Sequence, residues 1–337
     1  MNGWVVLASG GSPGGGLSIF NPASPSAHTI RSLFILVLAI TGVILVIVEG
    51  VLIYSIARFR RRPGETAEPP QVYGSMPIEI AWTAAPALTA FVLALILTRT
   101  EFGVRVDPKF PPAGSKPLYV TVIGHQWWWE YVYDRYDKDE LHFITANELH
   151  VPASAPGVPR PVYLTLKSVD VCHSFWVPRL AGKTDLIPGR VNQMWFQTNQ
   201  QGLFLGQCAE YCGTQHANML LRVKVDSPEE FQSWVENQQK PAVDSEPVRT
   251  GREIFLSQSC VNCHRVTGTS ARGSFGPDLT HLMSRQTLAS GMTPNTPEEL
   301  RNWLNDPQQS KEGCLMPRFG LDKSSVDLLI GYLTSLK

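Results

Sequence analysis

The chain has 337 residues, which is enough for two or three domains with separate hydrophobic cores. Its formal net charge is zero and only 17% of its residues are charged, so it lacks the basic excess that nucleic-acid-binding proteins use. The low charged fraction has a local cause, because apolar residues are concentrated near the N-terminus.

Two apolar segments in the first hundred residues are long enough to cross a bilayer. Leu33–Ile56 is interrupted by one charge, Glu49, and Ile80–Thr98 contains none. As helices they would be about 36 and 28 Å long, against a hydrocarbon core of about 30 Å. The alternative is a pair of buried helices in a soluble protein, which two such long neighbouring runs disfavour. We therefore expect a two-helix transmembrane hairpin over residues 30–100.

The charges around the first segment predict its orientation. Arginines follow it closely at positions 58 and 60–62, whereas its N-terminal flank offers only Arg31. Because basic residues are enriched in cytoplasmic loops, the loop between the segments is expected in the cytoplasm of a bacterial cell. Everything after the second segment then lies on the periplasmic side of the inner membrane. Residues 1–29 are rich in Gly, Ser and Pro and are expected to be a flexible tail.

The segment after the second span has the pattern of a β domain. Stretches such as PLYVTVIGHQWWWEYVY and LLRVKV alternate in polarity and are rich in β-branched and aromatic residues. We expect a compact β-sandwich or barrel over Lys116–Asp226. A helix should follow at Ser227, because Ser-Pro-Glu-Glu supplies an N-cap, a first-turn proline and a capping-box glutamate.

The C-terminal part is predicted to be a separate helical domain. A polar, proline-containing stretch at residues 239–249 is typical of a linker. Beyond it, over residues 250–337, the capping pattern recurs at Thr296 and again at Ser324.

The sequence CVNCH is the attachment pattern of a c-type haem. Two thioethers hold the porphyrin, and the adjacent imidazole is an axial iron ligand. A redox-active Cys-x-x-Cys followed by a chance histidine is the alternative, but the βαβ context that it requires is missing. The predicted haem-binding residues are Cys260, Cys263 and His264.

A sixth iron ligand should come from further along the chain. Met316, in the proline-marked loop CLMPRFG, is favoured over Met283, whose setting in DLTHLMSR resembles ordinary core spacing. From about residue 249 to the end, the chain resembles a class I cytochrome c. In that family the residue matching Pro277 offers its carbonyl to the axial histidine.

Soft metal ligands are concentrated in the stretch GQCAEYCGTQHANM, residues 206–219. A helix with these ligands on one face is an alternative, but the glycines and the flanking β pattern favour a loop between strands. A disulfide would leave the histidine and methionine unexplained. Thiolate, imidazole and thioether select copper, and two thiolates could bridge two copper ions if a second imidazole came from SVDVCHSFWVP. The candidate ligands are His173, Cys208, Cys212, His216 and Met219.

Four motifs, in order behind two spans, resemble subunit II of haem–copper cytochrome c oxidases: GHQWWWEY, VDVCHSFWVP, GKTDLIPGR and GQCAEYCGTQHANM. The resemblance covers residues from about 30 to 235, and the haem segment makes the chain similar to bacterial oxidases whose subunit II carries its own cytochrome c. It implies a cupredoxin-like domain over residues 101–238. It also implies a dinuclear copper centre, CuA, held by the five candidate side chains and the backbone carbonyl of Glu210.

The same resemblance implies three further roles. The Glu210 carboxylate would help to bind magnesium at the contact with subunit I. Glu79 matches an acid at the cytoplasmic mouth of a proton path into subunit I. Trp127 matches the aromatic residue through which electrons enter copper in relatives that use soluble donors; the alternative for it is a core aromatic residue. Cys172 is expected to be a small buried thiol that faces away from His173, and Glu49 is expected to face protein or water. Neither of these residues, nor Cys314, receives a functional role.

The implied function is electron entry into a terminal oxidase. Electrons would pass from haem c to CuA and then to subunit I, where oxygen becomes water and protons are pumped. The implied partners are subunits I and III, an upstream cytochrome c or other respiratory donor, and the lipid bilayer. A nitric oxide reductase with a copper-bearing subunit is the alternative enzyme. A copper chaperone would need neither haem nor membrane spans, and quinol-oxidase subunits lack these copper ligands.

Overall fold

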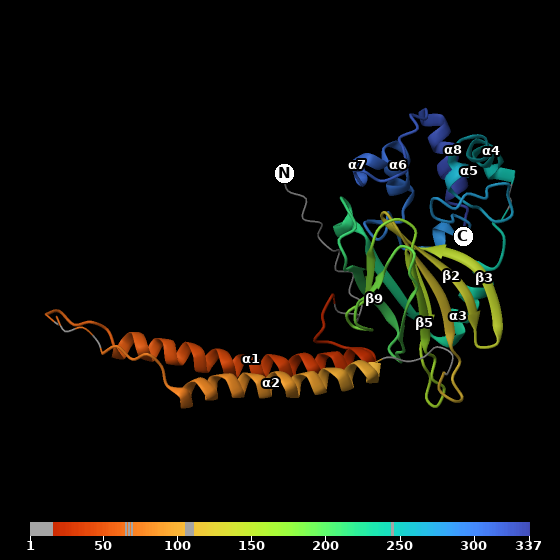
Figure 1. Cartoon of the computed structure of the whole chain (residues 1–337). Coiled ribbons are helices and arrows are strands. Elements are labelled where there is room, and N and C mark those ends of the chain that lie inside the picture. Colours follow the sequence, from red (N-terminus) through yellow and green to blue (C-terminus); the bar gives the residue numbers. More distant parts are fainter. Residues whose placement is uncertain (1–15, 65, 67, 69, 105–110, 244–245) are drawn as a thin grey trace. The chain divides into compact units, whose positions relative to one another are not determined.

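The computed structural model describes residues 16–64, 66, 68, 70–104, 111–243 and 246–337. The chain divides into two compact units. One unit, His28–Arg105, contains nearly all of two long helices, and the other contains a β domain and a C-terminal helical domain (Figure 1).

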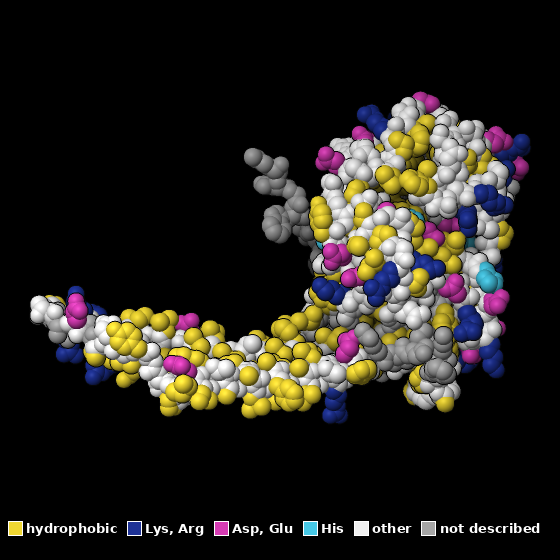
Figure 2. Space-filling model, in the orientation of Figure 1, with side chains coloured by type: hydrophobic (Ala, Val, Ile, Leu, Met, Phe, Trp, Pro, Cys, Tyr) yellow, Lys and Arg dark blue, Asp and Glu magenta, His cyan; other side chains and the backbone are white. Residues whose placement is uncertain are grey.

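The two long helices are α1 (Pro25–Arg58) and α2 (Met76–Val104). Both are long and apolar enough to cross a membrane, and their most apolar windows are entirely unburied in the chain. Hydrophobic side chains are frequent along the visible face of the two helices (Figure 2). The two predicted apolar helices are thus confirmed. A helix that is apolar all round needs lipid or a protein partner to cover it.

The last part of the predicted tail differs from the expectation of a free segment. Residues 1–15 lie outside the described part of the chain. Ala23, by contrast, is buried against the β domain, where its N–H donates to the Arg179 carbonyl at 2.8 Å. Its own carbonyl accepts from Thr198 Oγ1 at 2.6 Å. Small side chains let this backbone lie flat on the β domain, so this stretch is docked.

The β domain is a sandwich of two five-stranded sheets. The first sheet has the order β3 (Asp139–Ala146), β2 (Trp128–Tyr136), β1 (Leu118–His125), β5 (Val162–Ser168) and β8 (Asn192–Phe196). The second has the order β4 (Glu148–Pro152), β10 (Leu220–Asp226), β9 (Gly202–Cys208), β6 (His173–Trp176) and β7 (Thr184–Leu186).

The core of this domain lies between the sheets. Along β1, buried and partly exposed residues alternate, as the sequence pattern predicted. The pairs β1–β5 and β4–β10 are parallel and the other strand pairs within these two sheets are antiparallel. Helix α3 (Pro228–Gln238) closes one end, and its Trp234 stacks on buried His150 with ring centroids 4.3 Å apart.

The C-terminal domain is built from short helices. They are η2 (Glu246–Val248), α4 (Arg249–Ser257), α5 (Cys260–Cys263), η3 (Leu282–Ser284), α6 (Pro297–Asn305), α7 (Pro307–Ser310) and α8 (Lys323–Leu333). A small hairpin, β11 (Thr287–Leu288) with β12 (Thr293–Pro294), lies between η3 and α6.

Helices α4 and α8 pack closely because of one glycine. A Cβ added at Gly251 would lie 2.1 Å from the Leu328 carbonyl oxygen, so no larger residue fits there without moving a helix. Beside this contact, the rings of Phe255 and Tyr332 lie 5.7 Å apart between centroids.

The predicted linker is held at several points in its described residues. The Lys240 carbonyl lies 3.0 Å from His281 Nε2, and Ala242 N–H donates to Thr267 at 2.9 Å. Residues 244–245 lie outside the described part. The stretch therefore lies along the helical domain for much of its length.

Candidate copper and haem sites

The candidate copper ligands lie where strands of the second sheet end. Strand β9 ends at Cys208, whose N–H donates to the Met219 carbonyl at 3.0 Å. Strand β10 begins at Leu220, the residue after Met219. The loop predicted between these strands contains a single turn, η1 (His216–Asn218). Strand β6 begins with His173 and pairs with β9 at Cys208. Cys208 pairs with Phe175, and His173 lies two residues before Phe175 on the same face of β6. The strand pairing thus brings the His173 imidazole close to the Cys208 thiol.

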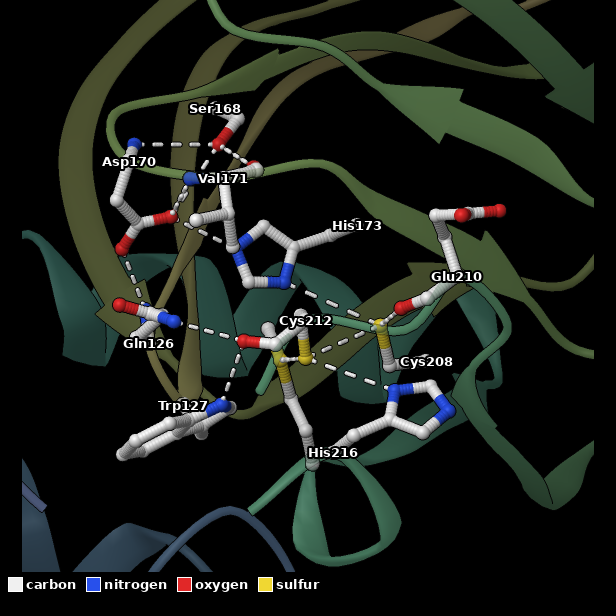
Figure 3. A network of polar contacts seen from close by, with 11 residues as sticks. Gln126, Trp127, Ser168, Asp170, Val171, His173, Cys208, Glu210, Cys212 and His216 are labelled. Atoms are coloured by element: carbon white, nitrogen blue, oxygen red, sulfur yellow. Dashed lines mark hydrogen bonds and ion pairs between the residues drawn. The ribbon is translucent and has the colours of Figure 1, made fainter. Parts of the chain in front are cut away.

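Two thiols and two imidazoles meet at this place (Figure 3). The sulfur atoms of Cys208 and Cys212 are 3.8 Å apart, too far for a disulfide bond of about 2.05 Å. His173 Nδ1 lies 3.9 Å from the Cys208 sulfur, and His216 Nδ1 lies 3.5 Å from the Cys212 sulfur. Each sulfur therefore has its own imidazole, with the ring nitrogen on the sulfur side.

Two weaker donors complete the set. The carbonyl oxygen of Glu210 lies 3.2 Å from the Cys208 sulfur, and the Met219 sulfur lies 3.8 Å from that of Cys212. The side chains of the cluster are buried, except that His216 is partly exposed and Glu210 is exposed. This donor set fits copper, because all its donors are soft or borderline except one carbonyl.

A carboxylate fixes the His173 ring. His173 is fully buried, and its Nε2 lies 2.8 Å from Asp170 Oδ1. Because the carboxylate accepts, Nε2 holds the hydrogen and Nδ1 keeps its lone pair for a metal. Burial opposes the charge on Asp170, but hydrogen bonds from His173, Val171 and Gln126 outweigh it and lower the pKa of this carboxyl. The sequence analysis missed Asp170, although an acid three residues before a ligand histidine was a usable signal.

Asp170→Ala should weaken copper binding by roughly ten- to a hundredfold, because the His173 ring loses the partner that orients it. The measurement is a competitive copper titration of the metal-free protein. Asp134→Ala, which removes an exposed carboxylate from β2, is the matched control and should bind copper normally. Equal affinities in the two variants would contradict this role.

The two thiols differ in their readiness to ionise. A hydrogen bond from Cys212 lowers the pKa of Cys208 to about 3; burial opposes this shift and His173 adds to it. The same bond raises the pKa of Cys212, because it stabilises the protonated form of that thiol, and burial adds to the shift. Both thiols must lose their protons to bind a metal, and the proton of Cys212 is the harder one to remove.

Two side chains of the β1–β2 turn hold the loop between β9 and β10, residues 209–219, which is called the copper loop below. The Cys212 carbonyl accepts from Trp127 Nε1 at 3.0 Å and from Gln126 Nε2 at 2.7 Å (Figure 3). The next residue, Gly213, has φ +115°, and a Cβ there would approach both side chains to 3.0 Å. The sequence analysis singled out Trp127 but not Gln126, whose partner lies 86 residues away.

A mostly apolar cavity of about 180 Å³ lies in the C-terminal domain and extends to the β domain. All four predicted haem-binding side chains line it: Cys260, Cys263, His264 and Met316. Trp127 and Trp128 line it from the β domain. Two thiols, an imidazole and a thioether around one apolar cavity fit a covalently attached haem.

The backbone fixes the His264 ring as expected. Its Nδ1 lies 2.8 Å from the Pro277 carbonyl, and a Cβ at Gly276 would lie 2.8 Å from the ring. Burial lowers the pKa of His264, which keeps the imidazole neutral, the form in which it binds iron.

The two candidate methionines lie in different surroundings. Met316 lines the cavity, where its sulfur lies 3.1 Å from Trp303 Nε1. Met283 packs against the hydrophobic core of the C-terminal domain, and its N–H donates to the Leu336 carbonyl at 2.7 Å. This arrangement supports Met316 as the axial ligand.

Three family models match successive parts of the chain. "Cytochrome C oxidase subunit II, transmembrane domain" matches residues 14–98, and the periplasmic domain of the same subunit matches residues 118–226. "Cytochrome c" matches residues 248–337. Cytochrome c oxidase subunit 2 of Alkalihalophilus pseudofirmus is 35% identical, and the match covers 95% of this chain and 91% of that protein.

The chain belongs to the cytochrome c oxidase subunit II family.

A second relative agrees with this assignment. Cytochrome c oxidase subunit 2 of Bacillus sp. strain PS3 is 34% identical, with 99% of this chain and 94% of that protein covered. Among solved structures, the periplasmic domain of subunit II from Bradyrhizobium japonicum is 33% identical, covers 36% of this chain and 93% of its own, and has a TM-score of 0.33. The residues that match the periplasmic-domain model contain the His/Cys/Cys group that fits a copper site, and those that match the cytochrome c model contain most of the residues that line the apolar cavity.

The remaining sequence candidates are Glu79, Cys172, Cys314 and Glu49. Glu79 lies in the first turn of α2, and its carboxylate accepts from Ser75 N–H at 3.2 Å. The expectation of a buried thiol at Cys172 was wrong: Cys172 is exposed, because β6 begins only at His173. The Cys314 sulfur lies 3.7 Å from the Met316 carbonyl. Glu49 is exposed on α1. None of these contacts assigns a role to Cys172, Cys314 or Glu49.

Proposed function

We propose that this chain is the electron-receiving subunit of a terminal cytochrome c oxidase. When bound, haem c and the dinuclear copper centre CuA supply one-electron redox chemistry, so that electrons from a donor reach subunit I for oxygen reduction coupled to proton pumping. The ligands that we propose for CuA are His173, Cys208, Cys212, His216, Met219 and the Glu210 carbonyl. Those that we propose for haem c are Cys260, Cys263, His264 and Met316.

The observation that carries this proposal is the position of Trp127. Its indole lines the haem cavity and also donates to the carbonyl of Cys212, a proposed copper ligand. One side chain thus contacts both sites, with a single hydrogen bond to the copper loop. This is a short through-bond connection of the kind that electron transfer requires.

The scaffold suits electron transfer as well as binding. Strand ends hold His173 and Cys208, and Asp170, Gln126 and Trp127 hold the ligands from outside. Ligands that are fixed in this way keep nearly the same geometry in both redox states, so that little reorganisation accompanies each electron.

We further propose the membrane setting and the partners. The periplasmic-domain match and the arginines after α1 support both soluble domains lying on the outer side of a bacterial inner membrane. Subunits I and III, and an upstream cytochrome c or other donor, are the proposed partners. The Glu210 carboxylate points away from the sulfurs while its carbonyl faces them (Figure 3). That geometry suits a second role for Glu210, in binding magnesium at the subunit I contact.

The test is to purify the complex that contains this chain and to compare oxygen uptake with nitric oxide reduction under the same donor. Oxygen uptake that is abolished by removal of copper supports the proposal. Turnover of nitric oxide without oxygen uptake would assign the chain to the alternative enzyme.

Glu79→Gln should slow oxygen turnover while leaving reduction of haem c and copper unchanged, if this acid admits protons from the cytoplasm. Steady-state oxygen uptake and stopped-flow absorption measure the two parts separately. Glu101→Gln, at the opposite end of α2, is the matched control and should turn over normally. Unchanged oxygen uptake in Glu79→Gln across neutral and alkaline pH would contradict the role.

A further inference from the structure

A lysine of the cytochrome c domain is buried in the β domain. The Lys311 side chain is 3% exposed, and its Nζ donates to the carbonyls of Trp127 at 2.8 Å, Asn218 at 2.9 Å and Ala289 at 3.0 Å. Two of these carbonyls belong to the β domain. Burial lowers the pKa of Lys311 to about 7, although nearby Cys314 and Cys212 oppose the shift. Three carbonyl acceptors match the three N–H groups of an ammonium.

A carboxylate of the β domain is buried in the cytochrome c domain in the same way. Glu148, at the start of β4, is 6% exposed. Its oxygens accept from Gln286 N–H at 3.0 and 2.9 Å, Thr287 N–H at 2.9 Å and Thr287 Oγ1 at 2.7 Å. A buried charge is unfavourable unless hydrogen bonds compensate it, and here the other domain supplies them.

Weaker contacts lie between these two points. Leu220 N–H, at the start of β10, donates to the Ser290 carbonyl at 3.2 Å. Gln215 Nε2, in the copper loop, donates to the Glu312 carbonyl at 2.7 Å. Because β10 pairs with β4 and directly follows the copper loop, these contacts lie between Glu148 and Lys311 and make the interface continuous from β4 to the copper loop.

We propose that Lys311 and Glu148 are positioning residues that keep the cytochrome c domain permanently docked on the β domain. Each domain inserts one charged side chain among the backbone polar groups of the other. Undocking would break the hydrogen bonds from Lys311 to the carbonyls of the β domain and those from Gln286 and Thr287 to Glu148. Hydrogen bonds to charged groups are among the stronger ones in proteins, so their loss opposes undocking. Docking itself does not depend on the proposed function. Its consequence does: electrons would cross a fixed interface, and the cytochrome c domain would not have to diffuse to the β domain before each transfer.

Docking also changes the part that Trp127 can play. The indole is 8% exposed, and a Cβ at Gly313 of the cytochrome c domain would lie 3.8 Å from its ring. An external donor therefore cannot reach Trp127 while the domains are docked. It must deliver electrons to the cytochrome c domain, and Trp127 lies between the two sites of this chain.

The test uses the full chain in detergent with Lys311→Met, Glu148→Gln and the double variant. Hydrogen exchange at Gln286, Thr287 and Leu220 measures docking without reference to electron transfer. In the native protein these amides should be protected. Loss of a buried partner should speed their exchange roughly ten- to a hundredfold, most in the double variant. Exchange in the native protein as fast as in an exposed loop would overturn the proposal.

A second measurement tests the consequence. After rapid reduction of haem c, the rate of copper reduction in the native protein should not depend on glycerol viscosity, whereas in the double variant it should fall as viscosity rises. Lys323→Met and Glu229→Gln, which remove exposed charges, should behave as the native protein does. A viscosity-dependent native rate would overturn docking. Protected amides without any copper reduction would instead leave docking intact and overturn the proposed electron path.

Discussion

Replacement of Cys208 and Cys212 by Ser should abolish oxygen uptake while haem c is still reduced by its donor at the native rate. The two sulfurs, 3.8 Å apart, are the thiolates that would hold the copper centre, and a serine hydroxyl is a poor copper ligand. Electrons should then accumulate on haem c. Stopped-flow absorption should show one haem reduction phase followed by a stall.

The exposed neighbour of His173 provides the control. Cys172→Ser removes a thiol that lies outside the cluster and should retain both copper and oxygen uptake. In the native protein the haem-to-copper step should be first-order and unaffected by dilution, whereas reduction by an external donor should be second-order and salt-dependent. Native rates of electron delivery to subunit I in the double serine variant would show that haem c bypasses copper.

Met316→Leu should retain covalent haem but lose its sulfur ligand. The attachment residues Cys260 and Cys263 are unchanged, and Leu has nearly the volume of Met, so the cavity wall should keep its shape. The near-infrared iron–sulfur charge-transfer band of the oxidised protein should vanish. The haem reduction potential should fall, because a thioether ligand raises it.

Met283→Leu is the matched variant, because Met283 packs in the core of the same domain and does not line the cavity. It should keep the charge-transfer band and the native potential. If the band is lost in Met283→Leu and persists in Met316→Leu, the assignment of the axial ligand is wrong.

Features that depend on residues close in sequence were largely predictable. Ser227 caps α3 as expected, with its hydroxyl accepting from Glu230 N–H, and Thr296 caps α6 through Glu299 N–H. The third cap was placed two residues too late. Asp322, not Ser324, accepts from the Ser325 N–H, since a carboxylate in extended backbone already satisfies the first turn of α8. Such competition between adjacent polar residues cannot be decided from spacing alone.

Features that depend on distant backbone atoms were not predictable. Lys311 and Glu148 look like ordinary surface charges in the sequence, since most of their partners are main-chain groups far along the chain. They lie 22, 93 and 184 residues away for Lys311 and 138 to 139 residues away for Glu148. Main-chain groups carry no sequence signal, so nothing near either residue marks it as buried. The ligand motifs were recognisable because copper and haem demand particular side chains, which local spacing preserves.

The contact at Gly251 has a consequence for how such a chain could have arisen. Because α4 meets α8 there, the beginning and the end of the cytochrome c domain lie together, and its haem-binding residues all fall between the two helices. A domain whose ends adjoin can be joined to another protein at either end, or inserted into a surface loop, without strain on its own fold. Fusion of a soluble electron carrier to a membrane-anchored copper domain would therefore have required no rearrangement of either fold. Later substitutions could then have been confined to surface positions of the two domains, where a few changes could convert a transient contact between them into a stable interface.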